Sequence, residues 1–168
     1  MGSGKTSTGL ALAERLGWEF VDLDEEIERR ERLSVRVLFR ERGETAFRAL
    51  EHEALRRSLA GRSKPTILAL GGGAFVQRNN VELLRASAVQ TVFLETPVEE
   101  MLMRCGVGAE PDPENPRPLA ADSLAFRKLY ERRLPFYREA QLTIDTRGKT
   151  VSEIAREIVE GLSLGASR

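Results

Sequence analysis

Short apolar runs alternate with helical patterns along almost the whole chain, and this alternation constrains the fold more than any other feature. The runs that have the length of strands lie at residues 18–22, 66–70, 89–94 and 142–145. The run at 66–70 (TILAL) is continuously apolar, which is typical of a strand buried on both faces. Strands separated by helices indicate an α/β fold with a mostly parallel sheet.

The stretches between these runs have the spacing of amphipathic helices. We expect helices at residues 6–16, from 24 to about 32, between 34 and 43, from 44 to about 60, at about 81–86, from 97 to 104, at 123–133 and at 151–162. Asp24 and Ser34 are the expected N-caps of two of them, and Gly43 is expected to end a helix. The stretch GVGAEPDPEN, rich in glycine, proline and acid, predicts a surface loop or lid.

The composition narrows the class of protein. The chain has 168 residues, which fits one domain, and its 26 basic residues balance its 26 acidic ones. Cys105 is the one cysteine, so an internal disulfide is impossible and a reducing compartment is indicated. No apolar run reaches the roughly 18 residues of a membrane span, and no signal peptide is visible. We therefore expect one cytoplasmic domain without nucleic-acid or membrane partners.

The opening residues MGSGKTSTG match the second half of a phosphate-binding loop, G-x-x-x-x-G-K-[ST]. Glycines let backbone N–H groups turn toward phosphates, and the helix expected from Thr6 adds the positive end of its dipole. Lys5 would reach the β- and γ-phosphates, and the Thr6 hydroxyl would ligate Mg²⁺. The alternative is a flexible tail ahead of a helix, but the helix directly behind the motif favours a nucleotide site.

Two acids and three glycines follow predicted strands. Alternation along the strand would put the carboxylates of Asp22 and Asp24 on one side, where one could hold Mg²⁺ through water and the other could accept a proton from an alcohol. The alternative is a helix cap plus a solvated acid, which explains Asp24 but leaves Asp22 unexplained. The glycines 71–73 could form a simple turn, or they could let a ligand approach the backbone closely.

Three arginines have an informative setting. Phe47 and Glu51 flank Arg48, and the i, i+3 spacing on a helix lets Glu51 orient its guanidinium. Arg133 lies just before Leu134-Pro135 at an expected helix end, and Arg117 stands between two prolines beside the expected lid. Arginine is the natural clamp for a carboxylate or a transferring phosphoryl group.

In this order, the motifs GSGKT, VDLD, GETAFRALE, LGGGA, RPL and ERRLPFY resemble those of the shikimate kinase family along nearly the whole chain. The resemblance implies a P-loop kinase with a three-layer α-β-α fold, a central parallel sheet in the family order 2-3-1-4-5, and a mobile lid at about 106–120 of a single domain 1–168. It also implies MgATP-dependent phosphorylation of the 3-hydroxyl of shikimate by a monomer. The product would be shikimate 3-phosphate, on the route to chorismate and the aromatic amino acids.

The resemblance also implies roles for single residues. Nucleotide contacts would come from Gly2, Ser3, Gly4, Lys5, Thr6, Ser7, Arg104, Arg117 and Arg147, with Arg104 stacked on adenine and Arg147 covering its other side. Mg²⁺ would be held at Thr6 and, through water, by Asp22. Shikimate would be bound by Asp24, Arg48, Gly71, Gly72, Gly73 and Arg133, the two arginines binding its carboxylate. The catalytic residues would be Lys5, Asp24 and Arg117, with Asp24 as a base and Arg117 closing onto the phosphoryl group.

The chain departs from the family pattern at its front and in its lid. The family has a strand and a first glycine ahead of GSGKT, and that strand is the central one of the sheet. The start could have been placed too late, the chain could have been trimmed, or the strand could be truly lost. Because a true loss would leave neighbouring strands without partners, we expect the natural protein to be longer. The lid is longer and more acidic than in the family, and Ala120 follows Arg117-Pro118-Leu119.

Two other functions remain open at this point. A different small-molecule P-loop kinase, such as one acting on gluconate, is disfavoured because Arg48, Arg133 and the three glycines suit a cyclic carboxylate. A non-catalytic nucleotide-binding module would be expected to lack Lys5, Asp24 or Arg117, and all three are present.

Overall fold

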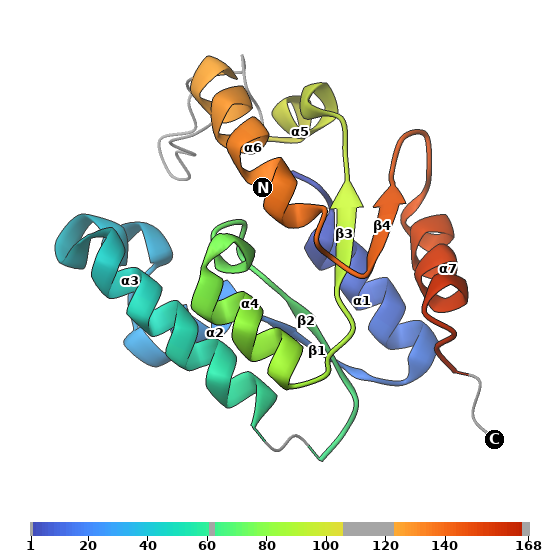
Figure 1. Cartoon of the computed structure of the whole chain (residues 1–168), viewed down its shortest axis with the longest axis horizontal. Coiled ribbons are helices and arrows are strands. Elements are labelled where there is room, and N and C mark those ends of the chain that lie inside the picture. Colours follow the sequence, from blue (N-terminus) through green and yellow to red (C-terminus); the bar gives the residue numbers. More distant parts are fainter. Residues whose placement is uncertain (1, 61–62, 106–122, 166–168) are drawn as a thin grey trace.

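The computed structural model describes residues 2–60, 63–105 and 123–165, and within them helices alternate with strands as expected (Figure 1). The elements are, in order, α1 Lys5–Leu16, β1 Glu19–Asp22, α2 Leu23–Glu31, α3 Val35–Leu59, β2 Thr66–Ala69, the 3₁₀ turn η1 Ala74–Val76, α4 Arg78–Ala86, β3 Val92–Glu95, α5 Val98–Arg104, α6 Ser123–Tyr137, β4 Leu142–Asp145 and α7 Val151–Gly161. The expected lid at 106–120 and its Arg117 lie outside the described residues. Within the described ranges, no helix is long and apolar enough to cross a membrane.

The strands form two parallel pairs. β1 pairs with β2 in a register that sets Glu19 opposite Thr66, and β3 pairs with β4 in a register that sets Val92 opposite Leu142. Within the described residues, no ladder joins β2 to β3. The two pairs therefore have the arrangement expected of a parallel sheet whose central strand is absent.

Helices cover both faces of these strands. On β2, Leu68 packs against a core built from α2, α3 and α4, whereas the preceding Ile67 packs against a core built from α1, β3, β4 and α7. Successive residues of a strand point to opposite faces, so β2 lies between the two groups of helices. Figure 1 shows α3 and α4 side by side in one group, and α1 beside α7 in the other. The predicted three-layer α-β-α arrangement is confirmed.

A cavity of about 620 Å³ lies between the two pairs of strands. Its apolar walls include Leu68 of β2, Phe93 of β3 and Leu12 of α1. The cavity also reaches Lys5 and Gly72, so the space between the pairs is continuous with the region of the phosphate loop. A slot bordered by β2 and β3 thus opens directly toward the candidate site.

The start of α2 near the acids differs from expectation, whereas the helix break at Gly43 agrees with it. The N-cap of α2 is Asp22, whose side chain accepts the Asp24 N–H, and Asp24 lies inside the first turn. The strand ends at Asp22 because its ladder with β2 ends there, so the prediction that Asp24 caps the helix is wrong. At Gly43 the backbone is not helical (φ 77°, ψ 171°), and α3 consists of two helices joined across a kink there, so the prediction that Gly43 ends a helix is confirmed.

The boundaries of α6 and β3 also differ. α6 continues through Pro135 to Tyr137, so Arg133 lies inside a helix rather than at its end. A proline removes one N–H of the helix, and we attribute the extra turn to contacts that Tyr137 makes with other elements. β3 begins at Val92: the Thr91 carbonyl oxygen still accepts the Leu142 N–H of β4, but the Thr91 N–H donates to the Gln141 side chain rather than to a neighbouring strand.

Candidate active site

The phosphate loop has the backbone that its glycines predict. Gly2 and Gly4 have φ of 74° and 83°, in the left-handed region that favours glycine, and α1 begins at Lys5 directly after Gly4. A Cβ at Gly2 would lie 2.7 Å from the carbonyl oxygen of Met101. Lys5 is half-buried and its Nζ donates to the Ser3 hydroxyl over 3.5 Å. The loop is therefore a turn at a helix N-terminus with a lysine folded over it, as anion binding requires.

Two buried threonines hold this loop at the carboxyl ends of β3 and β4. The Thr96 hydroxyl donates to the Ser3 carbonyl oxygen over 3.4 Å and accepts from the Thr146 hydroxyl over 2.8 Å. Both threonines are only 1% exposed. Sequence reasoning missed them, although each directly follows a strand, which is the place where ligand-facing side chains of α/β folds are found.

The two acids take different positions around the loop. The Thr6 hydroxyl donates to Asp22 Oδ2 over 3.3 Å, and Asp22 Oδ1 accepts the Asp24 N–H over 3.0 Å. Asp24 belongs to α2, so the argument from strand alternation is wrong, although Asp22 still acts electrostatically on Asp24. Burial and then the charge of Asp22 raise the pKa of the Asp24 carboxyl, and Lys5 opposes this shift. A carboxyl with a raised pKa beside a phosphate loop is suited to accepting a proton.

The Thr6–Asp22 pair is the arrangement that could hold Mg²⁺. Within the described residues, no group of three or more His, Cys, Asp or Glu side chains could hold a metal ion. Mg²⁺ commonly uses one or two protein carboxylates and completes its shell with water and substrate phosphates. One hydroxyl bonded to one carboxylate therefore fits Mg²⁺ that is delivered with a nucleotide.

The three glycines after β2 are needed for space. None of Gly71, Gly72 and Gly73 has a positive φ, so the turn itself does not require glycine. A Cβ at Gly71 would lie 2.8 Å from Asp24 Oδ1, and one at Gly73 would lie 2.3 Å from an Arg48 guanidinium nitrogen. The glycine turn is thus the floor against which the acid and the arginine pack, and this decides against the simple-turn interpretation.

Arg48 is fixed from several sides. Its guanidinium donates to Glu51 Oε2 over 2.8 Å and to Glu44 Oε1 over 3.1 Å. It also lies 5.5 Å and 5.4 Å from the ring centroids of Phe39 and Phe47, within cation–π range. Glu51 is 1% exposed; burial raises the pKa of its carboxyl, and Arg48 opposes that shift. The predicted orienting role of Glu51 is therefore matched by the geometry.

Arg133 reaches the same glycine turn from α6. A Cβ at Gly72 would lie 3.5 Å from an Arg133 guanidinium nitrogen and 3.4 Å from the Tyr137 hydroxyl oxygen. The Tyr137 hydroxyl donates to the Gly72 carbonyl oxygen over 2.5 Å. Two arginines that are far apart in sequence, Arg48 and Arg133, thus meet the turn at neighbouring glycines. Tyr137 was missed by sequence reasoning, although it stands in the same ERRLPFY motif as Arg133.

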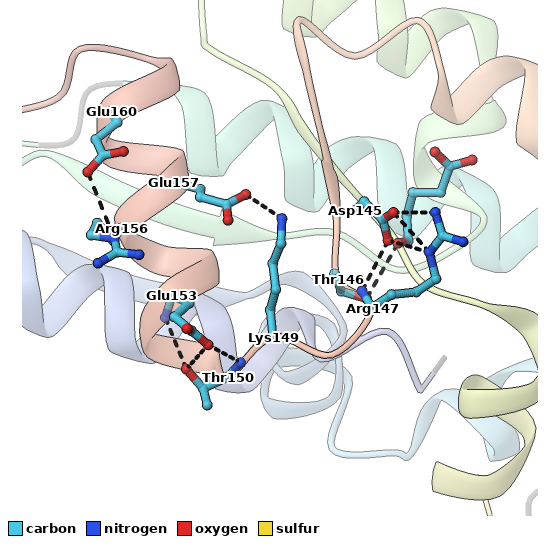
Figure 2. A network of polar contacts seen from close by, with 10 residues as sticks. Asp145, Thr146, Arg147, Lys149, Thr150, Glu153, Arg156, Glu157 and Glu160 are labelled. Atoms are coloured by element: carbon cyan, nitrogen blue, oxygen red, sulfur yellow. Dashed lines mark hydrogen bonds and ion pairs between the residues drawn. The ribbon is translucent and has the colours of Figure 1, made fainter.

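The predicted adenine-site arginines are near the loop but are paired with acids. Arg104 donates to the Gly2 carbonyl oxygen over 3.4 Å and to Glu100 over 2.8 Å. Figure 2 shows Arg147 folded back onto Asp145 at the end of β4, with a 2.5 Å contact that helps to lower the pKa of Asp145 to about 2. The charge of Glu100 also acts on Arg147, so both arginines lie near one carboxylate. Arg104 contacts the loop at Gly2 and Arg147 lies at the end of β4, and the contact of either arginine with adenine stays a prediction.

Together, the described layers and the site define a phosphate-loop kinase of small molecules. The chain belongs to the shikimate kinase family, because the family model described as shikimate kinase matches residues 1–163. A shikimate kinase of Moorella thermoacetica is 40% identical over 162 residues, which cover 96% of this chain and 90% of that protein. One of Persephonella marina is 36% identical over 159 residues, which cover 95% and 92%.

Solved structures agree with this assignment. A shikimate kinase from Acinetobacter baumannii in complex with shikimate matches with a TM-score of 0.85 and 37% identity, over 99% of this chain and 91% of that one. A gluconokinase from Sinorhizobium meliloti matches with a TM-score of 0.56 and 21% identity, which shows a shared fold alone. The predicted family, the α/β fold class and an ATP-dependent phosphotransferase that uses Mg²⁺ are confirmed.

Proposed function

We propose that this chain transfers the γ-phosphoryl group of ATP to the 3-hydroxyl of shikimate and forms shikimate 3-phosphate. The observation that carries the proposal is the meeting of Arg48 and Arg133 at the glycine turn beside Asp24. Two guanidinium groups at the far side of a pocket can bind a carboxylate, while the acid and the phosphate loop lie nearer the reacting hydroxyl. This order of groups matches a ring that carries a carboxylate at one end and hydroxyls at the other.

Binding of shikimate is proposed to rest on Arg48, Arg133 and the glycine turn. Arg48 is preorganised by Glu51 and by two phenylalanine rings, so little rotamer freedom is lost when a carboxylate binds. Gly71 and Gly73 leave room for Asp24 and Arg48 at the turn, and the backbone there is proposed to contact the ring. A ring fixes the distance between its carboxylate and its hydroxyls, whereas a longer open-chain acid does not. Gluconate is therefore the weaker candidate.

Transfer is proposed to depend on charge and position. The backbone of residues 2–6 and the N-terminus of α1 would bind the phosphates, and Lys5 would neutralise the β- and γ-oxygens. Mg²⁺ would supply further charge neutralisation when held at Thr6 and Asp22. Asp24 would orient the attacking hydroxyl and accept its proton, for which its raised pKa is favourable. Arg117 is proposed to close onto the phosphoryl group as part of a lid at about 106–120.

The catalytic unit is proposed to be a single-domain monomer. All the candidate residues come from one chain, and the proposed partners are only shikimate and the nucleotide. We further propose that the slot between β2 and β3 is filled by an extended apolar strand joined ahead of Met1. The slot is bordered by two parallel strands and opens toward Lys5, so a strand that runs parallel to them would end at the phosphate loop.

The substrate assignment is tested by comparing shikimate with its methyl ester, which keeps the ring and hydroxyls but removes the carboxylate charge. We expect the dissociation constant from calorimetry, with a non-hydrolysable ATP analogue present, to be at least tenfold higher for the ester. Arg48→Lys should reduce this discrimination, because lysine cannot make the bidentate contact. Equal binding of acid and ester would show that the arginines do not bind the carboxylate.

A further inference from the structure

Asn80, in the first turn of α4, is a buried polar side chain that lies behind the glycine turn. It is 1% exposed, and its amide nitrogen donates to the Ala74 carbonyl oxygen over 3.0 Å. Ala74 directly follows the three glycines and closes their turn, because its N–H donates to the Gly71 carbonyl oxygen over 3.0 Å. A buried amide is costly unless it is hydrogen-bonded, so this contact fixes where the end of the turn lies.

The other end of the same amide faces α3. Asn80 Oδ1 lies 2.7 Å from Nδ1 of His52, the one histidine of the chain. The Ala74 carbonyl oxygen can only accept, so the amide nitrogen of Asn80 faces it and the amide oxygen faces the imidazole. Because the amide oxygen also only accepts, His52 Nδ1 carries the proton of its contact. A continuous path of hydrogen bonds therefore runs from His52 through Asn80 to the end of the glycine turn.

α3 also holds the arginine that packs against this turn. Glu51, the residue before His52, is 1% exposed and accepts from the Arg48 guanidinium over 2.8 Å. A Cβ at Gly73 would overlap that guanidinium, so the turn and the arginine share a closely packed space. Figure 1 shows α3 and α4 side by side. Neighbouring residues of α3 thus fix both partners of this contact, Glu51 by holding Arg48 and His52 by holding Asn80.

The turn keeps other contacts that do not need Asn80. The Ala74 carbonyl oxygen also accepts from the Gln77 N–H over 3.3 Å, and the bond from Ala74 to Gly71 is made by the backbone alone. Ala74 is fully buried in the core built from α2, α3 and α4. The Asn80 amide therefore adds to the position of the turn relative to α3 rather than to its existence.

We infer that Asn80 is a positioning residue, whose side-chain amide joins the glycine turn to α3 through His52 and so keeps the turn in place beside Arg48 for the substrate carboxylate. The inference rests on the proposed binding of shikimate. A surface that is held before the ligand arrives loses less freedom on binding, and this gain appears as affinity. Neither Asn80 nor His52 is assigned a contact with a substrate.

The test compares Asn80→Leu with Asn79→Leu by calorimetry, with shikimate and its methyl ester as ligands and a non-hydrolysable ATP analogue present. Leucine nearly keeps the volume of asparagine and removes its donor and acceptor. We expect Asn80→Leu to weaken binding of shikimate about three- to tenfold and binding of the ester less than about twofold, because the turn is no longer held beside the arginine that binds the carboxylate.

Asn79→Leu is the matched control for this comparison. Asn79 is exposed, and its side chain accepts the Asn80 N–H over 3.0 Å in the same turn of α4. We expect this variant to change the affinity for either ligand less than about twofold. The inference is overturned if Asn80→Leu behaves like Asn79→Leu, or if it weakens binding of acid and ester equally.

Substitutions of His52 test the path of hydrogen bonds itself. His52→Leu removes the donor and should weaken shikimate binding about two- to fivefold, whereas His52→Asn places an N–H where Nδ1 was and should restore binding to within about twofold. In an Asn80→Leu background the two His52 variants should bind shikimate equally, because their acceptor is gone. A difference between them that persists in that background would overturn the inference.

Hydrogen exchange without shikimate separates this inference from the proposed function. If the starting chain binds the ATP analogue but not shikimate, the proposed function fails, and exchange of the Ala74 N–H then decides the inference. Asn80→Leu should speed that exchange about three- to tenfold, and Asn79→Leu should leave it unchanged. Equal exchange in the two variants would overturn the inference, and protection of the remaining core amides shows that both variants are folded.

Discussion

The slot between β2 and β3 allows a quantitative prediction about stability. The perturbation is an extension ahead of Met1 by about six apolar, β-branched residues and a glycine, which is the length of an ordinary strand. β2 and β3 each have four residues, so a parallel strand between them would form about eight ladder hydrogen bonds, each with a net value of about 0.5–1.5 kcal/mol. These bonds alone correspond to roughly 4–12 kcal/mol.

The cavity gives a second estimate. At about 24 cal/mol per Å³, removal of a 620 Å³ cavity would correspond to roughly 15 kcal/mol, which is an upper limit because the walls can relax. Both figures are comparable with the whole stability of an ordinary domain, about 5–15 kcal/mol. We therefore expect the extension to raise the free energy of unfolding by at least about 4 kcal/mol.

The assay is equilibrium unfolding in urea, followed by the fluorescence of Trp18, the one tryptophan, which lines the cavity. With an m-value of about 2 kcal/mol/M, the midpoint should rise by about 2 M. The control is an extension of equal length and similar hydrophobicity with prolines at alternate positions. Because proline has no N–H, this extension cannot form the hydrogen bonds of both ladders. If both extensions shift the midpoint equally, or if neither does, the slot does not bind a strand.

Three further predictions concern the site. Arg48→Lys should weaken shikimate binding roughly 10- to 100-fold by calorimetry, since charge-assisted bidentate contacts are lost, and an unchanged affinity would remove Arg48 from the pocket. Gly73→Ala should weaken shikimate binding more than Gly72→Ala does. The added Cβ would lie 2.3 Å from the Arg48 guanidinium at Gly73, whereas the nearest contact at Gly72 would be 3.4 Å away. The reverse order of affinities would contradict this packing. Asp22→Asn, which can still cap α2, should lower the pKa of Asp24 in a ¹³C-carboxyl titration without nucleotide, because a like charge is removed; a pKa that stays or rises would refute that cause.

Much of the fold could be predicted because its signals are local. The strand at Leu142–Asp145 and the helix that begins at Val151 were predicted from their apolar spacing, and the structure adds a capping box between Thr150 and Glu153 that the sequence analysis had not used. Figure 2 shows this cap and the ion pairs beside it, which join residues that are close in the sequence. The sequence signal for the phosphate loop is equally local, because its glycines, its lysine and the start of the helix are adjacent in the sequence.

The remaining features depend on contacts that sequence spacing does not reveal. The hydrogen bond from Tyr137 to Gly72 joins residues 65 positions apart, and the one from Thr96 to Ser3 joins residues 93 apart. The strand end at Asp22 is set by the ladder with β2, so the capping acid could not be chosen from the local pattern.

The function is tested most directly by a coupled assay of ADP release with MgATP, with shikimate or gluconate as acceptor, run on this chain and on the form extended into the slot. We expect shikimate to stimulate ADP release well above the acceptor-free rate and gluconate to leave it unchanged, with the larger response in the extended form. If both forms are folded and bind MgATP, but neither prefers shikimate to gluconate, the substrate assignment is wrong and only the phosphate-loop kinase remains.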